Sequence, residues 1–230
     1  MEQWLSRSEN LIGTNNLEKL KNSYVAVFGL GGVGSFVVEG LIRAGISKLL
    51  LVDNDTVEQS NINRQLLATH VTIGKDKVEL AKERCLAINP YASIQAEKIF
   101  FDKTTISILD SSLDYIVDAI DTIPSKILLI EQAKKLNIPI LSCMGTGNKL
   151  NPFAFEIADI AKTSVCPLAK KIRKEVKEKR LGKVKVLFST EEPKSFHKTD
   201  TPGSISFVPS VAGLLMASEV VKDLTNHYSF

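Results

Sequence analysis

Short runs of apolar residues alternate along this chain with longer segments in which apolar residues recur every three or four positions. An unbroken run such as 24–28 predicts a strand covered on both faces of a parallel sheet, and the periodic segments predict helices packed against that sheet. The strands that we expect are at 24–28, 48–53, 93–101, 115–120, 138–144, 153–160 and 183–189. The helices that we expect are at 15–23, 33–45, 75–88, 102–111, 124–137, 168–176 and 208–224.

This alternation of strands and helices is typical of the α/β class. We expect a Rossmann-like, doubly wound and mostly parallel sheet flanked by helices, with additional strands and one helix at the C-terminal end. A chain of 230 residues suits a single domain with a sizeable core. No apolar run reaches the roughly 18 residues of a membrane span, and the first residues lack the layout of a signal peptide. We therefore expect a cytoplasmic protein without a membrane partner.

A glycine-rich turn, VAVFGLGGVGS, joins the first long strand to the helix after it. In such a turn Gly29 permits the sharp bend, Gly31 admits a phosphate to the backbone, and Gly34 lets the helix pack closely on the sheet. Asp53 closes the second strand, where an acid can bind ribose hydroxyls. This pattern fits a dinucleotide oxidoreductase as well as an enzyme that cleaves a nucleotide, so it leaves both open.

The loop that follows Asp53 favours a triphosphate. It reads DNDTVEQSNINRQ and supplies Asn61, Arg64 and Gln65, and Lys77 begins the next helix. Attack on the α-phosphorus requires cations that neutralise the β- and γ-phosphates. A dinucleotide is already served by the glycine turn and needs no such cluster.

Two acids, Asp118 and Asp121, lie in the sequence DAIDT at the end of a later strand. Open α/β sheets bind ligands at that edge, and a carboxylate there can hold Mg²⁺ together with phosphate oxygens. Asp118 could instead cap the following segment. The alternative for the two cations of the preceding loop and helix is surface ion pairing with Asp76 or Glu79.

The basic residues of the chain are concentrated in one segment. The formal net charge is +3, yet residues 170–185 hold nine Lys or Arg residues and two Glu. Such a segment indicates a polyanionic partner such as a nucleic acid, or else a solvated helix face. The three cysteines, Cys85, Cys143 and Cys166, lack C-x-x-C spacing, so we expect no structural zinc. Cys166 is the one cysteine that we consider for thiol chemistry.

Taken together, GLGGVGS, DNDTVEQSNINRQ, Lys77 and DAIDT resemble the ATP-dependent adenylating superfamily that includes the ubiquitin-activating enzymes. Within it, SRSENLIG, DIAKTSVCPLAKKIRKE and VLFSTEEP are similar to the tRNA threonylcarbamoyladenosine dehydratase family, over nearly the whole chain. The resemblance implies an enzyme that uses ATP and Mg²⁺ to adenylate the threonine carboxylate of a modified tRNA adenosine, with release of pyrophosphate. Ring closure to a cyclic hydantoin then releases AMP.

The resemblance also assigns roles to single residues. Asp121 would hold the ATP-bound magnesium, and Arg7 would reach the ATP of the other subunit of a homodimer. The catalytic set would be Arg7, Arg64, Lys77 and Asp121, and the nucleotide site would be Gly29, Gly31, Gly32, Gly34, Asp53, Asn61, Arg64, Gln65 and Lys77. We expect a tRNA path along Lys170, Lys171, Arg173, Lys174 and Lys177. Residues 1–230 would then be a single adenylating domain, with a nucleotide-binding half at 1–150 and a half facing substrate, tRNA and dimer partner at 151–230.

Other functions stay open. One is adenylation of the C-terminal glycine of a ubiquitin-like sulfur carrier, although the paired C-x-x-C motifs of those enzymes are missing here. Another is a nucleotide-binding scaffold for sulfur transfer that has no turnover, and a nicotinamide dehydrogenase is the least favoured. The sequence also leaves open whether a monovalent cation binds, and whether a cysteine desulfurase or sulfur acceptor is a partner.

Overall fold

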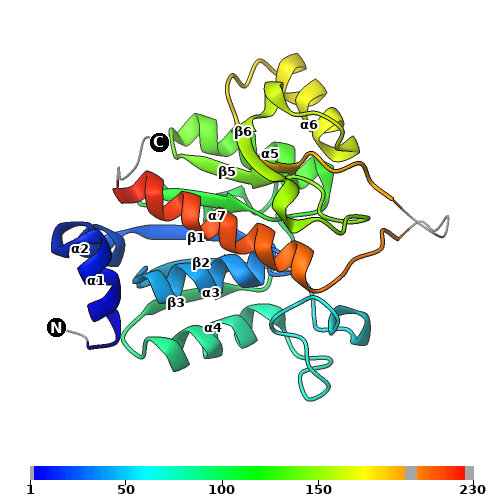
Figure 1. The fold of residues 1–230 in the computed structure, drawn as a ribbon. Helices are drawn as coiled ribbons and strands as arrows, with labels where there is room; N and C mark the ends of the chain where they lie inside the picture. Colours follow the sequence, from blue (N-terminus) through cyan, green and yellow to red (C-terminus); the bar gives the residue numbers. More distant parts are fainter. Residues whose placement is uncertain (1–2, 195–200, 226–230) are drawn as a thin grey trace.

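The structure is a computed structural model that describes residues 3–194 and 201–225, and it is built on one seven-stranded sheet (Figure 1). Across the sheet the strands follow the order β3, β2, β1, β4, β5, β7, β6. Neighbouring strands are parallel except β6 and β7, which are antiparallel. The strands are β1 (Tyr24–Phe28), β2 (Lys48–Val52), β3 (Ser93–Glu97), β4 (Tyr115–Asp118), β5 (Ile140–Cys143), β6 (Phe155–Asp159) and β7 (Lys185–Ser189). The expected doubly wound, mostly parallel sheet is confirmed.

Different helices cover the two faces of the sheet. The longer helices are α3 (Gly34–Ala44), α4 (Lys77–Ile88), α5 (Ile123–Leu136), α6 (Pro167–Glu178) and α7 (Phe207–Thr225). Val25 and Val27 of β1 lie in the core shared with α3, α4 and α7, whereas Ala26 and Phe28 lie in the core shared with α5 and α6. Because strand side chains alternate between faces, burial on both sides explains the unbroken apolar run.

Helix α7 lies directly on α3 (Figure 1). A β-carbon at Gly40 of α3 would lie 2.7 Å from the β-carbon of Ala217, and one at Gly213 of α7 would lie 2.4 Å from the carbonyl oxygen of Val33. Since such distances are too short for real side-chain atoms, these two glycines let the helices approach within backbone contact. The last helix thereby covers the helix that follows the glycine turn.

The predicted helix at 102–111 is wrong, because that region holds only the short 3₁₀ helix η3 (Ile106–Ile108). The Asp102 carboxylate accepts hydrogen bonds from the backbone N and the hydroxyl of Thr104, at 2.7 and 2.6 Å, and such local bonds compete with helix formation. The N-terminal segment η1 (Gln3–Leu5) and α1 (Ser6–Ile12) precedes α2 (Thr14–Asn22) and was not expected. The other 3₁₀ helices are η2 (Gln59–Asn61), η4 (Pro152–Ala154) and η5 (Ile160–Lys162).

Candidate functional site

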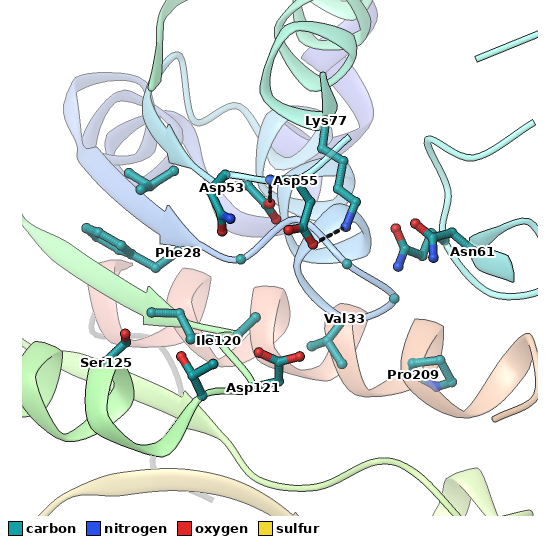
Figure 2. Close-up of a pocket in the computed structure, with 18 of the residues that line it drawn as sticks. Phe28, Val33, Asp53, Asp55, Asn61, Lys77, Ile120, Asp121, Ser125 and Pro209 are labelled. Carbon is teal, nitrogen blue, oxygen red and sulfur yellow. Dashed lines mark hydrogen bonds and ion pairs between the residues drawn. The ribbon is translucent and has the colours of Figure 1, made fainter. Parts of the chain in front are cut away.

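A cavity of about 680 Å³ opens at the carboxyl ends of β1, β2 and β4, where the chain reverses its direction of travel across the sheet. Open α/β sheets bind ligands at this position. The cavity is bordered by the glycine turn, the ends of β2 and β4, the loop at 54–65 and the start of α7 (Figure 2). The residues predicted from sequence that line it are Gly29, Gly31, Gly32, Asp53, Asn61, Arg64, Gln65, Lys77 and Asp121. Separate parts of the chain thus converge on one site.

The glycine turn contains glycines of two kinds. Gly29 has φ 86°, and a β-carbon there would lie 2.6 Å from the carbonyl oxygen of Ala119. A β-carbon at Gly34 would lie 1.7 Å from the carbonyl oxygen of Gly29, and Gly34 does not line the cavity. A β-carbon at Gly31 would approach, among the described residues, only Gln65, at 3.7 Å. Backbone packing therefore requires glycine at positions 29 and 34. A side chain at position 31 would instead only reduce the space in the cavity.

The Asp53 carboxylate ties the end of β2 to the glycine turn. One oxygen accepts a hydrogen bond from the backbone N of Leu30 at 2.6 Å, and the other accepts one from the backbone N of Asp55 at 2.8 Å. Burial raises the pKa of Asp53 above its usual value, while both hydrogen bonds and the positive charge of Lys77 act in the opposite direction. The acid for which the sequence predicts ribose binding is thus held in place by the backbone.

Lys77 is the first residue of α4 and is 4% exposed. Its Nζ lies 2.8 Å from a carboxylate oxygen of Asp55, which also lines the cavity (Figure 2). Asp76, the partner considered from sequence, instead pairs with Lys98 at 2.7 Å. The Lys77 cation therefore lies within the cavity, and its partner there is an acid of the cavity wall.

The loop between β2 and α4 folds around η2. Asn61 is 6% exposed, and its side-chain oxygen accepts a hydrogen bond from the backbone N of Glu58 at 3.2 Å. The Arg64 guanidinium donates to the carbonyl oxygen of Ser60 at 2.7 Å and to the side-chain oxygen of Asn63 at 2.8 Å. Neither contact of Arg64 neutralises its charge, which stays available to an anion at the cavity.

Two buried oxygen atoms of the cavity wall have no hydrogen-bond partner within the described part of the chain. They are the side-chain carbonyl of Gln65 and the hydroxyl of Thr122, and both residues line the cavity. Buried polar atoms are nearly always paired, so these two point to a ligand or ordered water as their partner. The observation supports a site built to hold a polar molecule.

The two acids of DAIDT lie in different environments. Asp121 is exposed at the cavity, as the sequence predicts (Figure 2). Asp118 is fully buried outside the lining and pairs with Lys126 at 2.8 Å. Asp118 also accepts a hydrogen bond from the backbone N of Ile120 at 3.1 Å, so it acts on the following segment, as its alternative interpretation states. Lys126, which the sequence analysis missed, carries no signal in a single sequence beyond a lysine among apolar helix positions.

Sequence reasoning also missed the apolar end of the cavity. Phe28 at the end of β1 packs edge-on against Phe101, with ring centroids 5.0 Å apart. Ile99 and Ile120 line the same cavity, and in Figure 2 Phe28 and Ile120 lie on the side opposite Asn61. The available signal was the presence of apolar residues at strand ends and within four residues after them. The cavity therefore has one apolar end and one end with Lys77 and neighbouring polar groups.

Arg7 lies on α1, is exposed, and does not line the cavity of its own chain. The Leu5 side chain beside it lies 3.6 Å from the β-carbon position of Gly45, which follows the last residue of α3. The glycine turn is at the opposite end of this helix, and 11 helical residues span about 16 Å. The prediction that Arg7 acts on the ATP of another subunit therefore stays a prediction.

The basic residues of α6 lie on its outer side, because Ala169, Ile172 and Val176 are buried beneath the helix. The exposed members of the predicted tRNA path are Lys170, Lys171, Lys174 and Lys177. Arg173 differs, since its guanidinium donates to the carbonyl oxygen of Thr163 at 2.5 Å and to the Thr163 hydroxyl at 2.7 Å. We therefore separate Arg173, which ties α6 to the residue that follows η5, from the four exposed lysines.

The cysteines are all buried. Burial raises the pKa of Cys85 and of Cys143 to about 12, so these thiols are poor nucleophiles at neutral pH. Cys166 is 3% exposed at the start of α6. Across residues 3–194 and 201–225, none of the helices combines the length and apolar character needed to cross a bilayer.

Comparisons with known proteins agree with this geometry. The ThiF family matches residues 5–229. The tRNA threonylcarbamoyladenosine dehydratase of Bacillus subtilis is 45% identical, over 95% of this chain and 93% of that protein. Crystal structures of the Escherichia coli tRNA N6-threonylcarbamoyladenosine dehydratase superpose with a TM-score of 0.91 for the AMP complex and 0.89 for the ATP complex, each at 30% identity. They cover 98% and 97% of this chain, and this chain covers 96% and 94% of theirs.

The fold and the cavity together define a Rossmann-like nucleotide-binding domain, with a glycine turn and the cations Arg64 and Lys77 at its site. Similarity to known dehydratases over nearly the full length of the chain identifies the family within this class of nucleotide-binding domains. The chain belongs to the ThiF family and, within it, to the tRNA threonylcarbamoyladenosine dehydratases.

Proposed function

We propose that this protein uses ATP to dehydrate threonylcarbamoyl-adenosine in tRNA, closing the modification to its cyclic hydantoin form. The observation that carries the proposal is the convergence, in one cavity, of a glycine turn open at Gly31 and two cations, Arg64 and Lys77. Full-length similarity to dehydratases of this nucleoside supports the choice of substrate. A tRNA substrate in turn supports a cytoplasmic location.

The chemistry begins with a carboxylate, which is a poor electrophile because oxide is a poor leaving group. Attack of the threonine carboxylate on the α-phosphorus of ATP gives an acyl adenylate and releases pyrophosphate. A nitrogen of the same modification then attacks the activated carbonyl, closes the ring and releases AMP. Because this nucleophile belongs to the substrate, its effective concentration is high and no enzyme thiol is needed. A mechanism without an enzyme thiol is consistent with a chain whose three cysteines are buried.

The cavity divides naturally along the nucleotide. The apolar end with Phe28 and Ile120 suits the adenine base, and Asp53 between the two ends suits the ribose hydroxyls. Gly31 and Gly32 suit the phosphates, where backbone N–H groups and the start of α3 favour an anion. Lys77, Arg64 and Asn61 then lie where the charge of the leaving pyrophosphate develops, and fixed cations stabilise that charge.

The residues present fit a magnesium ion that binds with the nucleotide. Asp121 offers an exposed carboxylate at the cavity. Residues 3–194 and 201–225 contain no group of three or more His, Cys, Asp or Glu side chains that could hold a metal ion by themselves. The protein would therefore contribute Asp121, and phosphate oxygens and water would supply the other ligands. When bound, Mg²⁺ adds positive charge next to the phosphates.

A homodimer in which Arg7 enters the partner's cavity is part of the proposal. In the described structure Arg7 is exposed on α1, away from its own cavity. Exposed apolar side chains on α7, Phe207, Leu214 and Leu215, offer a surface that a second copy can cover. A monomer would then lack one cation of the site.

The half of the chain at 151–230 is proposed to meet the tRNA. Four exposed lysines of α6 (Lys170, Lys171, Lys174 and Lys177) supply the charge, and the neutralisation of phosphates dominates nucleic-acid affinity. Arg173 instead ties α6 to Thr163 through two hydrogen bonds. The surface belongs to α6, whereas the ATP cavity lies at the ends of β1, β2 and β4.

The test is to incubate the protein with ATP, Mg²⁺ and threonylcarbamoylated tRNA, and to analyse the nucleosides and nucleotides by mass spectrometry. The proposal expects a nucleoside that has lost one water, together with AMP and pyrophosphate. ADP as the product, or an unchanged nucleoside, would contradict it. A parallel assay with a ubiquitin-like sulfur carrier tests the other adenylation reaction, in which the adenylate would form on that protein's C-terminal glycine.

A further inference from the structure

A buried ion pair lies beneath the cavity, and the proposed chemistry does not use it. Lys126 and Asp118 are both 0% exposed, and their charged atoms are 2.8 Å apart. The Lys126 ammonium also donates to the backbone oxygen of Cys143 at 2.9 Å, and the Ser142 hydroxyl donates to Asp118 at 2.6 Å. The pair therefore joins the end of β4, the end of β5 and the first turns of α5.

The second carboxylate oxygen of Asp118 holds the cavity wall. It accepts a hydrogen bond from the backbone N of Ile120 at 3.1 Å. Residues 119–122 form a turn, all four of whose members line the cavity. The Ala119 carbonyl in this turn lies 2.6 Å from the β-carbon position of Gly29, so the turn and the glycine turn are in backbone contact.

Stability alone gives little reason for this arrangement. Taking two charges out of water costs so much that replacing a buried ion pair by apolar residues of similar volume is often neutral or stabilising. An apolar pair cannot, however, accept the hydrogen bond that the backbone N–H of Ile120 donates to Asp118. An acceptor at position 118 is what keeps that N–H paired, and the lysine is what makes an ionised acceptor tolerable inside the core.

We infer that Asp118 and Lys126 are positioning residues, which hold the turn at 119–122 so that the Asp121 carboxylate stays at the phosphate end of the cavity. The inference rests on the proposed function, because that function gives Asp121 its task. Asp118 acts through the backbone of Ile120, and Lys126 acts through Asp118. Neither side chain touches the nucleotide.

Two double variants separate positioning from stability. D118N/K126M removes both charges. The asparagine side-chain oxygen can still accept the hydrogen bond from the backbone N of Ile120, and its amide N–H can donate to the Ser142 hydroxyl oxygen. D118L/K126M has similar volume and no acceptor. If the leucine variant does not fold, D118V/K126M replaces it, since a β-branched residue suits the end of a strand. Thermal unfolding, amide hydrogen exchange of the peptide that contains Ile120, and kcat and KM for ATP are measured for each.

We expect both variants to fold, with exchange at Ile120 faster in the leucine variant. We expect its kcat to be lower than that of the asparagine variant by about tenfold, with KM for ATP little changed, because the lost hydrogen bond misplaces Asp121 without emptying the base site. Equal exchange and equal kcat in the two variants would overturn the inference. If the wild type itself forms no AMP, the proposed function fails, while the exchange measurement still tests the hold on the turn.

Discussion

The ammonium of Lys77 lies 2.8 Å from the carboxylate of Asp55, inside the cavity that the sequence predicts for a triphosphate. The Lys77 side chain is 5% exposed and the Asp55 side chain is 58% exposed. The cation is therefore held at the start of α4, while the anion is the partner that can turn toward solvent. We therefore expect a phosphate oxygen to replace Asp55 as the partner of Lys77.

This relationship predicts opposite effects for the two partners. D55N removes an anion that competes with phosphate, so we expect tighter ATP binding. K77M removes a charge-assisted hydrogen bond and should weaken binding by about tenfold or more. Isothermal titration with a non-hydrolysable ATP analogue measures both changes. E79Q, at an exposed carboxylate of the same helix, is the control and should bind like the wild type.

The two kinds of glycine predict different failures. G31A should fold with an unfolding midpoint near that of the wild type, because the added carbon meets only Gln65 among the described residues, at 3.7 Å. Its ATP binding should be weakened, since the carbon would take space from the cavity where we propose that the phosphates lie. G34A should fail to fold stably, because its carbon would lie 1.7 Å from a carbonyl oxygen. An unstable G31A, or a stable G34A, would contradict this assignment.

Arg64 should matter to turnover and not to folding. Its two hydrogen bonds are to neutral groups of its own loop, at 2.7 and 2.8 Å. We expect R64A to keep its circular dichroism spectrum and to lose about 10²-fold or more in kcat, the usual effect of removing a group that stabilises developing charge. R43A, which breaks the ion pair with Glu39 on the surface, is the matched control. Wild-type turnover in R64A would remove Arg64 from the site.

Charge reversal on α6 should affect tRNA and spare ATP. In K170E/K174E/K177E the exposed side of the helix becomes acidic while Arg173 and its bonds to Thr163 remain. We expect weaker tRNA binding and a salt dependence whose slope falls by about 2 to 3, because fewer tRNA phosphates are neutralised by the protein. Filter binding over a range of salt concentrations measures both. The control K19E/K103E/K135E reverses the same number of exposed lysines elsewhere, and an equal loss of affinity in both variants would argue against a specific path.

Sequence patterns predicted the features that depend on local order. The unbroken run of β1, the helix α4 begun by Lys77, and the glycine turn are each contained in one short stretch, and the structure agrees with them. The environment of Asp118 could not be predicted in this way, because its partners Lys126 and Ser142 come from α5 and β5. The prediction of a helix at 102–111 was wrong for a different reason. The Asp102 carboxylate accepts hydrogen bonds from the backbone N and the hydroxyl of Thr104, and these local bonds compete with helix formation.

The packing of α7 on α3 has a consequence for the synthesis of the protein. The helix that follows the glycine turn is covered by α7, residues 207–225, and Pro209 of α7 lies 3.1 Å from the β-carbon position of Gly32. Until α7 has been synthesised, α3 and the glycine turn lack the helix that packs on them. We therefore expect the proposed nucleotide site to be complete only after α7 has left the ribosome and packed on α3.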